Sequence, residues 1–135
     1  MSSTFNKFYP FVAAAANGTF NLGSDTLEIA LTDSAPVDTY SNKSSLTEIS
    51  YSNLSSRTFT ASSSSQTGGT YSLKAAALTL TASGTVAQFR YVVLYDSTAS
   101  GALIGWWDYG SEVNLLSGDT FEVGFDQTNG ILQLT

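Results

Sequence analysis

The chain of 135 residues is long enough for one domain that buries its own hydrophobic core. Hydrophobic residues make up 42% and charged residues only 12%, which excludes a disordered chain and leaves serine and threonine to supply most of the polarity. The net charge is −6 and the five basic residues are scattered, so no cationic patch for nucleic acid or anionic lipid exists. Cysteine and histidine are absent, which excludes disulfides, thiolates and imidazole bases, and no apolar run approaches the roughly 18 residues of a membrane span. We therefore expect no nucleic-acid or membrane partner.

Residues 1–20 predict an N-terminal arm or a short helix. Apolar side chains recur at three- and four-residue spacing from Phe5 to Val12, and a run of alanines and an Asn-Gly stop signal follow. Pro10 lies about two turns into this pattern, so the helix would begin near it or be kinked there. An extended arm anchored by aromatic side chains fits the pattern equally well. The apolar run 11–16 is too short, and its flank too weakly basic, to indicate a secretion signal.

Residues 21–135 predict a single β-sandwich domain. The first strand is expected at 25–32, where apolar residues alternate with others as on a sheet with one buried face. Two further short strands are expected at 46–51 and 57–61. The serine-rich stretch 62–69 predicts an exposed, mobile loop.

The middle of the chain carries the strongest strand signals. Residues 70–81 alternate in two registers, which a kink or bulge near 75–77 would join. Two β-branched and aromatic runs, 89–95 and 103–109, flank the polar turn segment 96–101. This arrangement is typical of a β-hairpin with a loop of intermediate length.

The C-terminal part continues the same rhythm. A short edge strand is expected at 112–116, an alternating strand at 120–126, and a closing strand at 131–135 after an Asn-Gly tight turn at 129–130. Strands with turn signals about every ten residues indicate an all-β fold, an antiparallel β-sandwich or a jelly-roll-like barrel.

Carboxylates are the remaining candidates for chemistry, and we interpret them as structural. Glu122 is out of phase with its apolar neighbours and should face solvent, while Asp119 and Asp126 lie in turns that aspartate favours. Asp108 and Glu112 would need a facing acid to act as a glycosidase pair, and no calcium-loop spacing is present. We therefore predict no catalytic residues, no cofactor and no metal.

Trp106 and Trp107 are adjacent on an expected strand, so one should enter the core while the other faces outward. The outward ring could stack on a sugar, pack on the N-terminal segment or enter a neighbouring subunit. We favour one core tryptophan and one subunit contact.

Several stretches of the chain form a recognisable set of motifs: FNKFYPFV at the start, SDTLEIALTDSAPV, SSSSQTGGTYSL, and a C-terminal run that contains FRYVVLYD, LIGWWDYG and FEVGFDQTNGILQL. Together they resemble a widespread family of small structural proteins of tailed bacteriophages. The similarity covers most of the chain, and the C-terminal half is its specific part. Residues 50–56 (SYSNLSS) stand where many relatives carry a G-N-G-Y-x-x-G-G-like segment, so this loop should differ in shape.

The resemblance implies a virion component, and a capsid decoration, or cement, protein is the role that fits best. Such a protein would lie on the capsid surface, bind the major capsid protein and stabilise the head, and we expect a homo-oligomer, with a trimer favoured. A location on the tail stays open. The resemblance brings no catalytic residues with it.

The expected contact residues are aromatic. The segment 5–12 and the hydroxyl-rich stretch 62–69 are candidates for the shell or subunit contact. The chief rival is a tail or fibre module that binds host glycans through exposed tryptophan and tyrosine side chains, and a hydrolase around Asp108 or Glu112 is a third class. The individual candidates for the interaction are Phe5, Phe8, Tyr9, Phe11, Trp107 and Tyr109.

Overall fold

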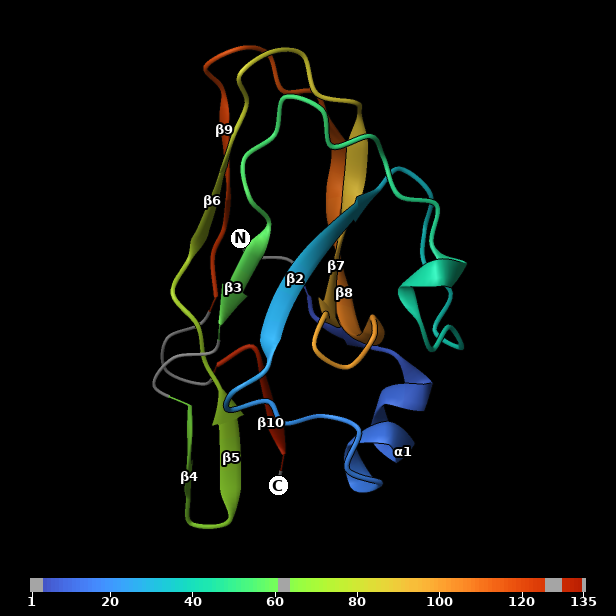
Figure 1. Ribbon diagram of the computed structural model, residues 1–135, viewed down its shortest axis with the longest axis vertical. Helices are drawn as coiled ribbons and strands as arrows, with labels where there is room; N and C mark the ends of the chain where they lie inside the picture. The colour runs from blue at the N-terminus through green and yellow to red at the C-terminus, as the bar shows by residue number, and fades with distance from the viewer. Residues whose placement is uncertain (1–3, 61–63, 126–129, 135) are drawn as a thin grey trace.

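Antiparallel sheets form most of the computed structural model, which describes residues 4–60, 64–125 and 130–134 (Figure 1). The predicted all-β antiparallel sandwich is confirmed, with one short α-helix beside the sheets. In chain order the elements are β1 (Asn6–Lys7), α1 (Tyr9–Ala16), β2 (Thr26–Thr32), the 3-10 helix η1 (Lys43–Ser45), β3 (Thr58–Thr60), β4 (Ser65–Thr67), β5 (Thr70–Leu73), β6 (Leu78–Thr81), β7 (Phe89–Asp96), β8 (Ala102–Val113), β9 (Thr120–Val123) and β10 (Leu132–Leu134).

The largest sheet has the strand order β1-β8-β7-β2-β3, and the predicted hairpin of β7 and β8 lies at its centre. Ser100 and Gly101, with φ of 59° and 84°, close the turn of this hairpin. β2 pairs along the other side of β7, as its alternating sequence predicts. Ala30 and Thr32 are also buried, so β2 is covered more completely than a strand with one buried face.

β6 and β9 pair with each other and form a second layer against the large sheet (Figure 1). Aromatic rings join the two layers: Phe89 of β7 meets Phe121 of β9 edge-on with ring centroids 5.2 Å apart. Phe59 of β3 packs on Phe125 at 5.4 Å. The buried apolar residues of the described chain form one cluster.

β4, β5 and β10 form a third, three-stranded sheet, which corrects the expectation of a loop at 62–69. β4 pairs with β5 around Gly68 and Gly69, whose φ values are 57° and 86°. All three residues of β4 are exposed, so the strand has no hydrophobic alternation for sequence reasoning to detect. Residues 62 and 63 lie outside the described part of the chain.

Other boundaries also differ from the sequence expectations. The stretch 46–51 contains no strand and contributes only an isolated bridge to β2. The expected strand 70–81 is broken rather than kinked, because β5 and β6 belong to different sheets. No separate edge strand forms at 112–116: residues 112 and 113 are the end of β8. The expected turn at 129–130 begins outside the described residues.

The N-terminal segment combines the two forms that its sequence allows. β1 pairs with β8, and α1 then begins at Tyr9, with Pro10 in the first turn where its missing N–H costs nothing. Phe5 lies directly on Gly105 and its ring meets Trp107 with centroids 5.2 Å apart. The arm is therefore pinned to the protein's own sheet.

Candidate interaction surface

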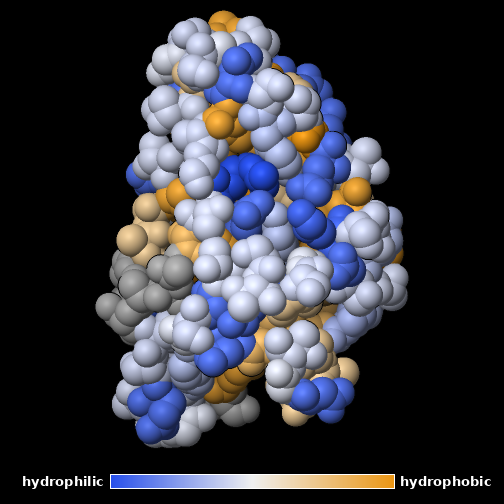
Figure 2. Space-filling view, in the orientation of Figure 1, coloured by the Kyte–Doolittle hydropathy of each residue, from blue (hydrophilic) through white to orange (hydrophobic). Residues whose placement is uncertain are grey.

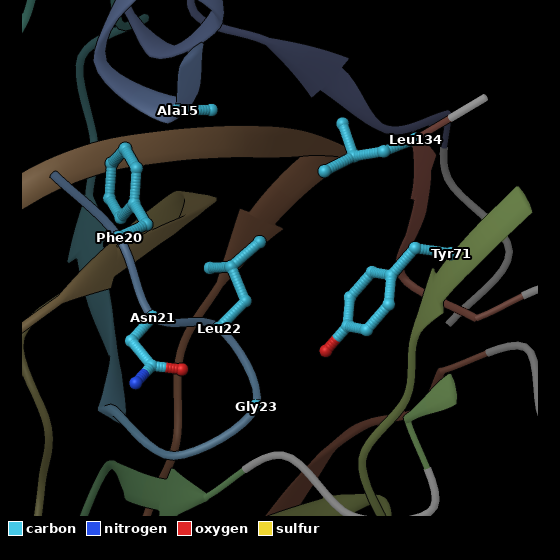
Figure 3. Close-up of a pocket in the computed structure, with 7 residues that line it drawn as sticks. All are labelled: Ala15, Phe20, Asn21, Leu22, Gly23, Tyr71 and Leu134. Carbon is cyan, nitrogen blue, oxygen red and sulfur yellow. The ribbon is translucent and has the colours of Figure 1, made fainter. Parts of the chain in front are cut away.

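An apolar groove lies between α1 and the three-stranded sheet, and we call it the α1–β10 groove. It consists of two hollows that share Ala15 and Leu134. The larger hollow, of about 490 Å³, is lined by Ala15, Phe20, Asn21, Leu22, Gly23, Tyr71 and Leu134 (Figure 3). The smaller hollow, of about 290 Å³, is lined by Lys7, Phe11, Val12, Ala15, Ala16 and Leu134.

The helical wall of the groove follows from the sequence of α1, YPFVAAAA, which contains no charged residue. An amphipathic surface helix turns polar residues outward, whereas this helix is apolar on every side. Phe11 enters the core and packs on Phe20 with ring centroids 5.1 Å apart. Tyr9 and Val12 keep 65% and 53% of their surface exposed. The helix therefore presents an apolar face that nothing in the described chain covers.

The sheet wall follows from strand alternation. Tyr71 of β5 and Leu134 of β10 are paired in register, so their side chains share one face of the three-stranded sheet. The Tyr71 hydroxyl points into the larger hollow, opposite Leu22 (Figure 3). Hydrophobic residues also show in the notch between the lobe that carries α1 and the lobe that carries β4 and β5 (Figure 2).

The opposite face of the same small sheet is polar. Gln133 Nε2 donates a hydrogen bond of 3.2 Å to Ser72 Oγ across the strands. The three-stranded sheet thus separates an apolar groove from a hydroxyl-rich surface. A shallow hollow of about 340 Å³ on the polar face is lined by Ser65, Thr67, Thr70, Ser72, Lys74 and Gln133.

The structure separates the aromatic residues that the sequence nominated for the interaction. Phe8 and Phe11 are 0% and 2% exposed, so they belong to the core and cannot serve as free anchors. Phe5 is half-buried against the sheet. Tyr9 lies exposed at the start of α1, and Tyr109 is exposed while its ring rests against Phe121.

The tryptophans point to opposite faces, as alternation predicts, but Trp107 is the buried one. Its exposure of 5% corrects its assignment as an outward contact or glycan platform. Its ring lies between Phe5 and Phe125, at 5.2 and 6.0 Å, because this face of β8 is covered by the arm and the second layer. Trp106 is the half-exposed ring, and its Nε1 donates to Asp38 Oδ1 at 3.3 Å.

The carboxylates considered for catalysis have structural partners. Arg90 donates two hydrogen bonds to Asp108, of 2.8 and 3.1 Å, which lower the pKa of that carboxyl. Gln88 donates to both Glu112 and Asp33, and the neighbouring Asp33 carboxyl raises the pKa of Glu112.

Two more of these acids lie on the surface near β9. Asp119 accepts from the Leu116 N–H in a turn, and Glu122 faces solvent as predicted. Asp126 lies outside the described residues. Across residues 4–60, 64–125 and 130–134, no three acidic side chains come together as a metal site would require.

A partly buried polar network around Arg57 was not predicted from the sequence. Arg57 lies 3.2 Å from Glu28, donates to the Ile29 carbonyl at 2.6 Å, and stacks its guanidinium 3.5 Å from the Tyr51 ring centroid. Tyr51 in turn donates to Glu48, and burial raises the pKa of its hydroxyl. The network fastens the irregular segment before β3 onto β2, so its role is structural.

Comparisons with protein-family models, with curated proteins and with solved structures give no match for this chain. In the part of the chain that the structure describes, no helix is long and apolar enough to cross a membrane. The surface chemistry and the sequence motifs quoted above therefore carry the functional argument.

Proposed function

We propose that this protein is a non-enzymatic structural component of a tailed-bacteriophage virion: a capsid decoration protein that binds the major capsid protein and stabilises the head. The observation that carries the proposal is the α1–β10 groove, an uncharged helix and an apolar sheet face left open to solvent. The motif resemblance supports the same class of protein.

The chemistry of the groove suits adhesion. Burying apolar surface contributes about 25 cal/mol per Å² removed from water, and exposed apolar patches commonly mark protein–protein contacts. Among the described residues that line the two hollows, Lys7 alone is charged. A partner that covers the groove therefore has few charged groups to remove from water, and the free-energy cost of desolvation is small. A homotrimer would present three such grooves and multiply a weak contact through avidity.

The rigidity of the groove also suits adhesion. The buried side chain of Phe11 anchors the helical wall in the core, and the preceding strand β1 is hydrogen-bonded to β8. A preformed surface loses little conformational freedom on binding, which leaves more of the burial energy for affinity.

The proposal is tested by occupancy on undecorated shells assembled from the major capsid protein of the phage that encodes this chain. Val12→Asp places a charge in the groove at an exposed position, so the fold should persist while bound copies per shell fall at least tenfold. Leu116→Asp is the matched control, because Leu116 is 59% exposed and lines neither hollow of the groove. If the wild-type protein does not bind the shells, the proposal is refuted. If both variants bind in equal numbers, the groove is not the contact surface.

A further inference from the structure

Two carboxyl groups meet inside the protein where two turns come together. Asp25 ends the turn that leads from α1 to β2, and Asp96 ends β7 and opens the turn to β8. Asp96 is 0% exposed and Asp25 is 8% exposed. Asp96 pairs with Leu27 in the sheet and the Ser97 N–H donates to the Thr26 carbonyl, which brings the two carboxyl groups to the same place, where each shifts the pKa of the other. Because carboxylates only accept hydrogen bonds, a hydrogen bond between the two groups requires one shared proton.

Among the described residues, few donors surround the two carboxyl groups, so a proton on Asp96 is the available donor between them. Asp25 Oδ2 accepts from the Asn21 N–H at 3.0 Å, and Asp96 Oδ1 accepts from the Ala99 N–H at 3.0 Å. Asp96 Oδ2 is buried, and no N–H or O–H group of the described residues donates to it. A buried carboxylate oxygen without a donor is costly, which favours the protonated form.

Burial and the neighbouring Asp25 raise the pKa of Asp96 to about 7, while the interaction with Asp96 lowers the pKa of Asp25. Asp25 is the ionisable group that interacts with Asp96. Charged side chains on β2 and on η1 engage Tyr95: Glu28 accepts from its hydroxyl, and the Lys43 ammonium lies 5.1 Å from its ring centroid.

We propose that the Asp25–Asp96 pair is a proton-operated clasp, which holds the turn after α1 against the β7–β8 turn while one proton is shared and loosens when that proton leaves. Two buried carboxylates would then repel each other. Two other hydrogen bonds still join the two turns: the Ser97 N–H donates to the Thr26 carbonyl, and the Thr26 N–H donates to Thr98 Oγ1. The turns therefore loosen without separating.

The clasp bears on the α1–β10 groove, because Asn21, whose N–H is held by Asp25, lines the larger hollow. Loosening the pair should therefore make this wall of the groove more mobile above neutral pH. This pH response belongs to the isolated protein and does not depend on whether the groove binds a capsid.

The test is the pH dependence of unfolding in wild type and in Asp96→Asn, whose amide donates to Asp25 at every pH. Folded Asp96 keeps a proton that the unfolded chain loses between about pH 4 and pH 7, so stability falls as pH rises, by up to tenfold in the unfolding constant per pH unit. We expect the wild-type unfolding constant to rise ten- to hundredfold from pH 5 to pH 8 and that of Asp96→Asn to rise less than threefold. Glu122→Gln, an exposed control, should keep the wild-type rise.

Two further measurements cover the case in which Asp96→Asn fails to fold. In wild type the Asp96 carboxyl carbon should titrate near pH 7 by NMR, and Asp25→Asn should move this titration down. The Asn21 and Ala99 amides should lose hydrogen-exchange protection between pH 5 and pH 8, whereas the Phe8 amide, bonded to the Ile104 carbonyl, should keep it. Titration of Asp96 near pH 4, or an unchanged rise in Asp96→Asn, would overturn the clasp.

Discussion

Gly105→Ala tests whether the N-terminal arm is truly part of the fold. Gly105 is buried in β8, and an added Cβ would enter the ring of Phe5 and lie 2.8 Å from the Asn6 carbonyl oxygen. The ring could rotate away, but the carbonyl belongs to β1, so the strand itself must shift from β8. The backbone of residue 105 poses no obstacle, because its φ lies outside the left-handed region.

The cost can be worked from what the shift removes. Half of the burial of a phenylalanine is worth about 1–1.5 kcal/mol, and the ring contact between Phe5 and Trp107 about 0.5–1.5 kcal/mol. The expected loss is therefore about 1.5–3 kcal/mol, which corresponds to roughly 6–12 °C in Tm for a chain of this size. Urea unfolding followed by tryptophan fluorescence measures it.

A double-mutant cycle separates the clash from other effects. In a Phe5→Ala background the ring and its contacts are already gone, so Gly105→Ala should lose most of this cost and retain only the clash with the Asn6 carbonyl. Gly23→Ala is the matched control, because its added Cβ would meet only the Tyr71 hydroxyl at 3.6 Å, an ordinary contact. Additive costs in the cycle, or a Gly105→Ala variant as stable as Gly23→Ala, would refute the pinned arm.

The other predictions concern burial and the polar network. Trp107→Ala should destabilise the protein by about 3–5 kcal/mol in urea unfolding, because the ring is buried, and Trp106→Ala by clearly less. The reverse order would mean that the two rings have been assigned to the wrong faces. Arg57→Lys should cost about 1–3 kcal/mol, because an ammonium cannot stack on a ring and reach Glu28 and the Ile29 carbonyl together. Arg90→Lys, at an ion pair that is more exposed than that of Arg57, should leave the transition almost unchanged, and a loss equal to that of Arg57→Lys would contradict this account.

Sequence reasoning succeeded where the signal is local. The β7–β8 hairpin is formed by two apolar runs joined by a polar turn, so the local sequence pattern is enough to predict it. It failed at β4, since Ser65–Thr67 is a strand held by backbone pairing with β5 and not by apolar contacts. Alternation placed Trp106 and Trp107 on opposite faces but could not say which face the second layer would cover.

The groove and the Asp25–Asp96 pair could not be predicted from the sequence, because both depend on contacts between distant parts of the chain. Ala15 and Leu134 meet in the groove although they lie at opposite ends of the sequence. Asp25 and Asp96 are both turn residues, for which local hydrogen bonding is a sufficient explanation until the fold brings them together. The one usable signal was α1 itself, an apolar helix without a polar side.

The central proposal is that this β-sandwich acts by adhesion to the assembled head of a virion. Cryo-electron microscopy of purified virions of the phage proposed to carry this protein tests it most directly. The account predicts ordered copies on the outside of the head, with α1 and β10 turned toward the capsid. Particles that lack the protein, or that carry it only along the tail, would contradict it.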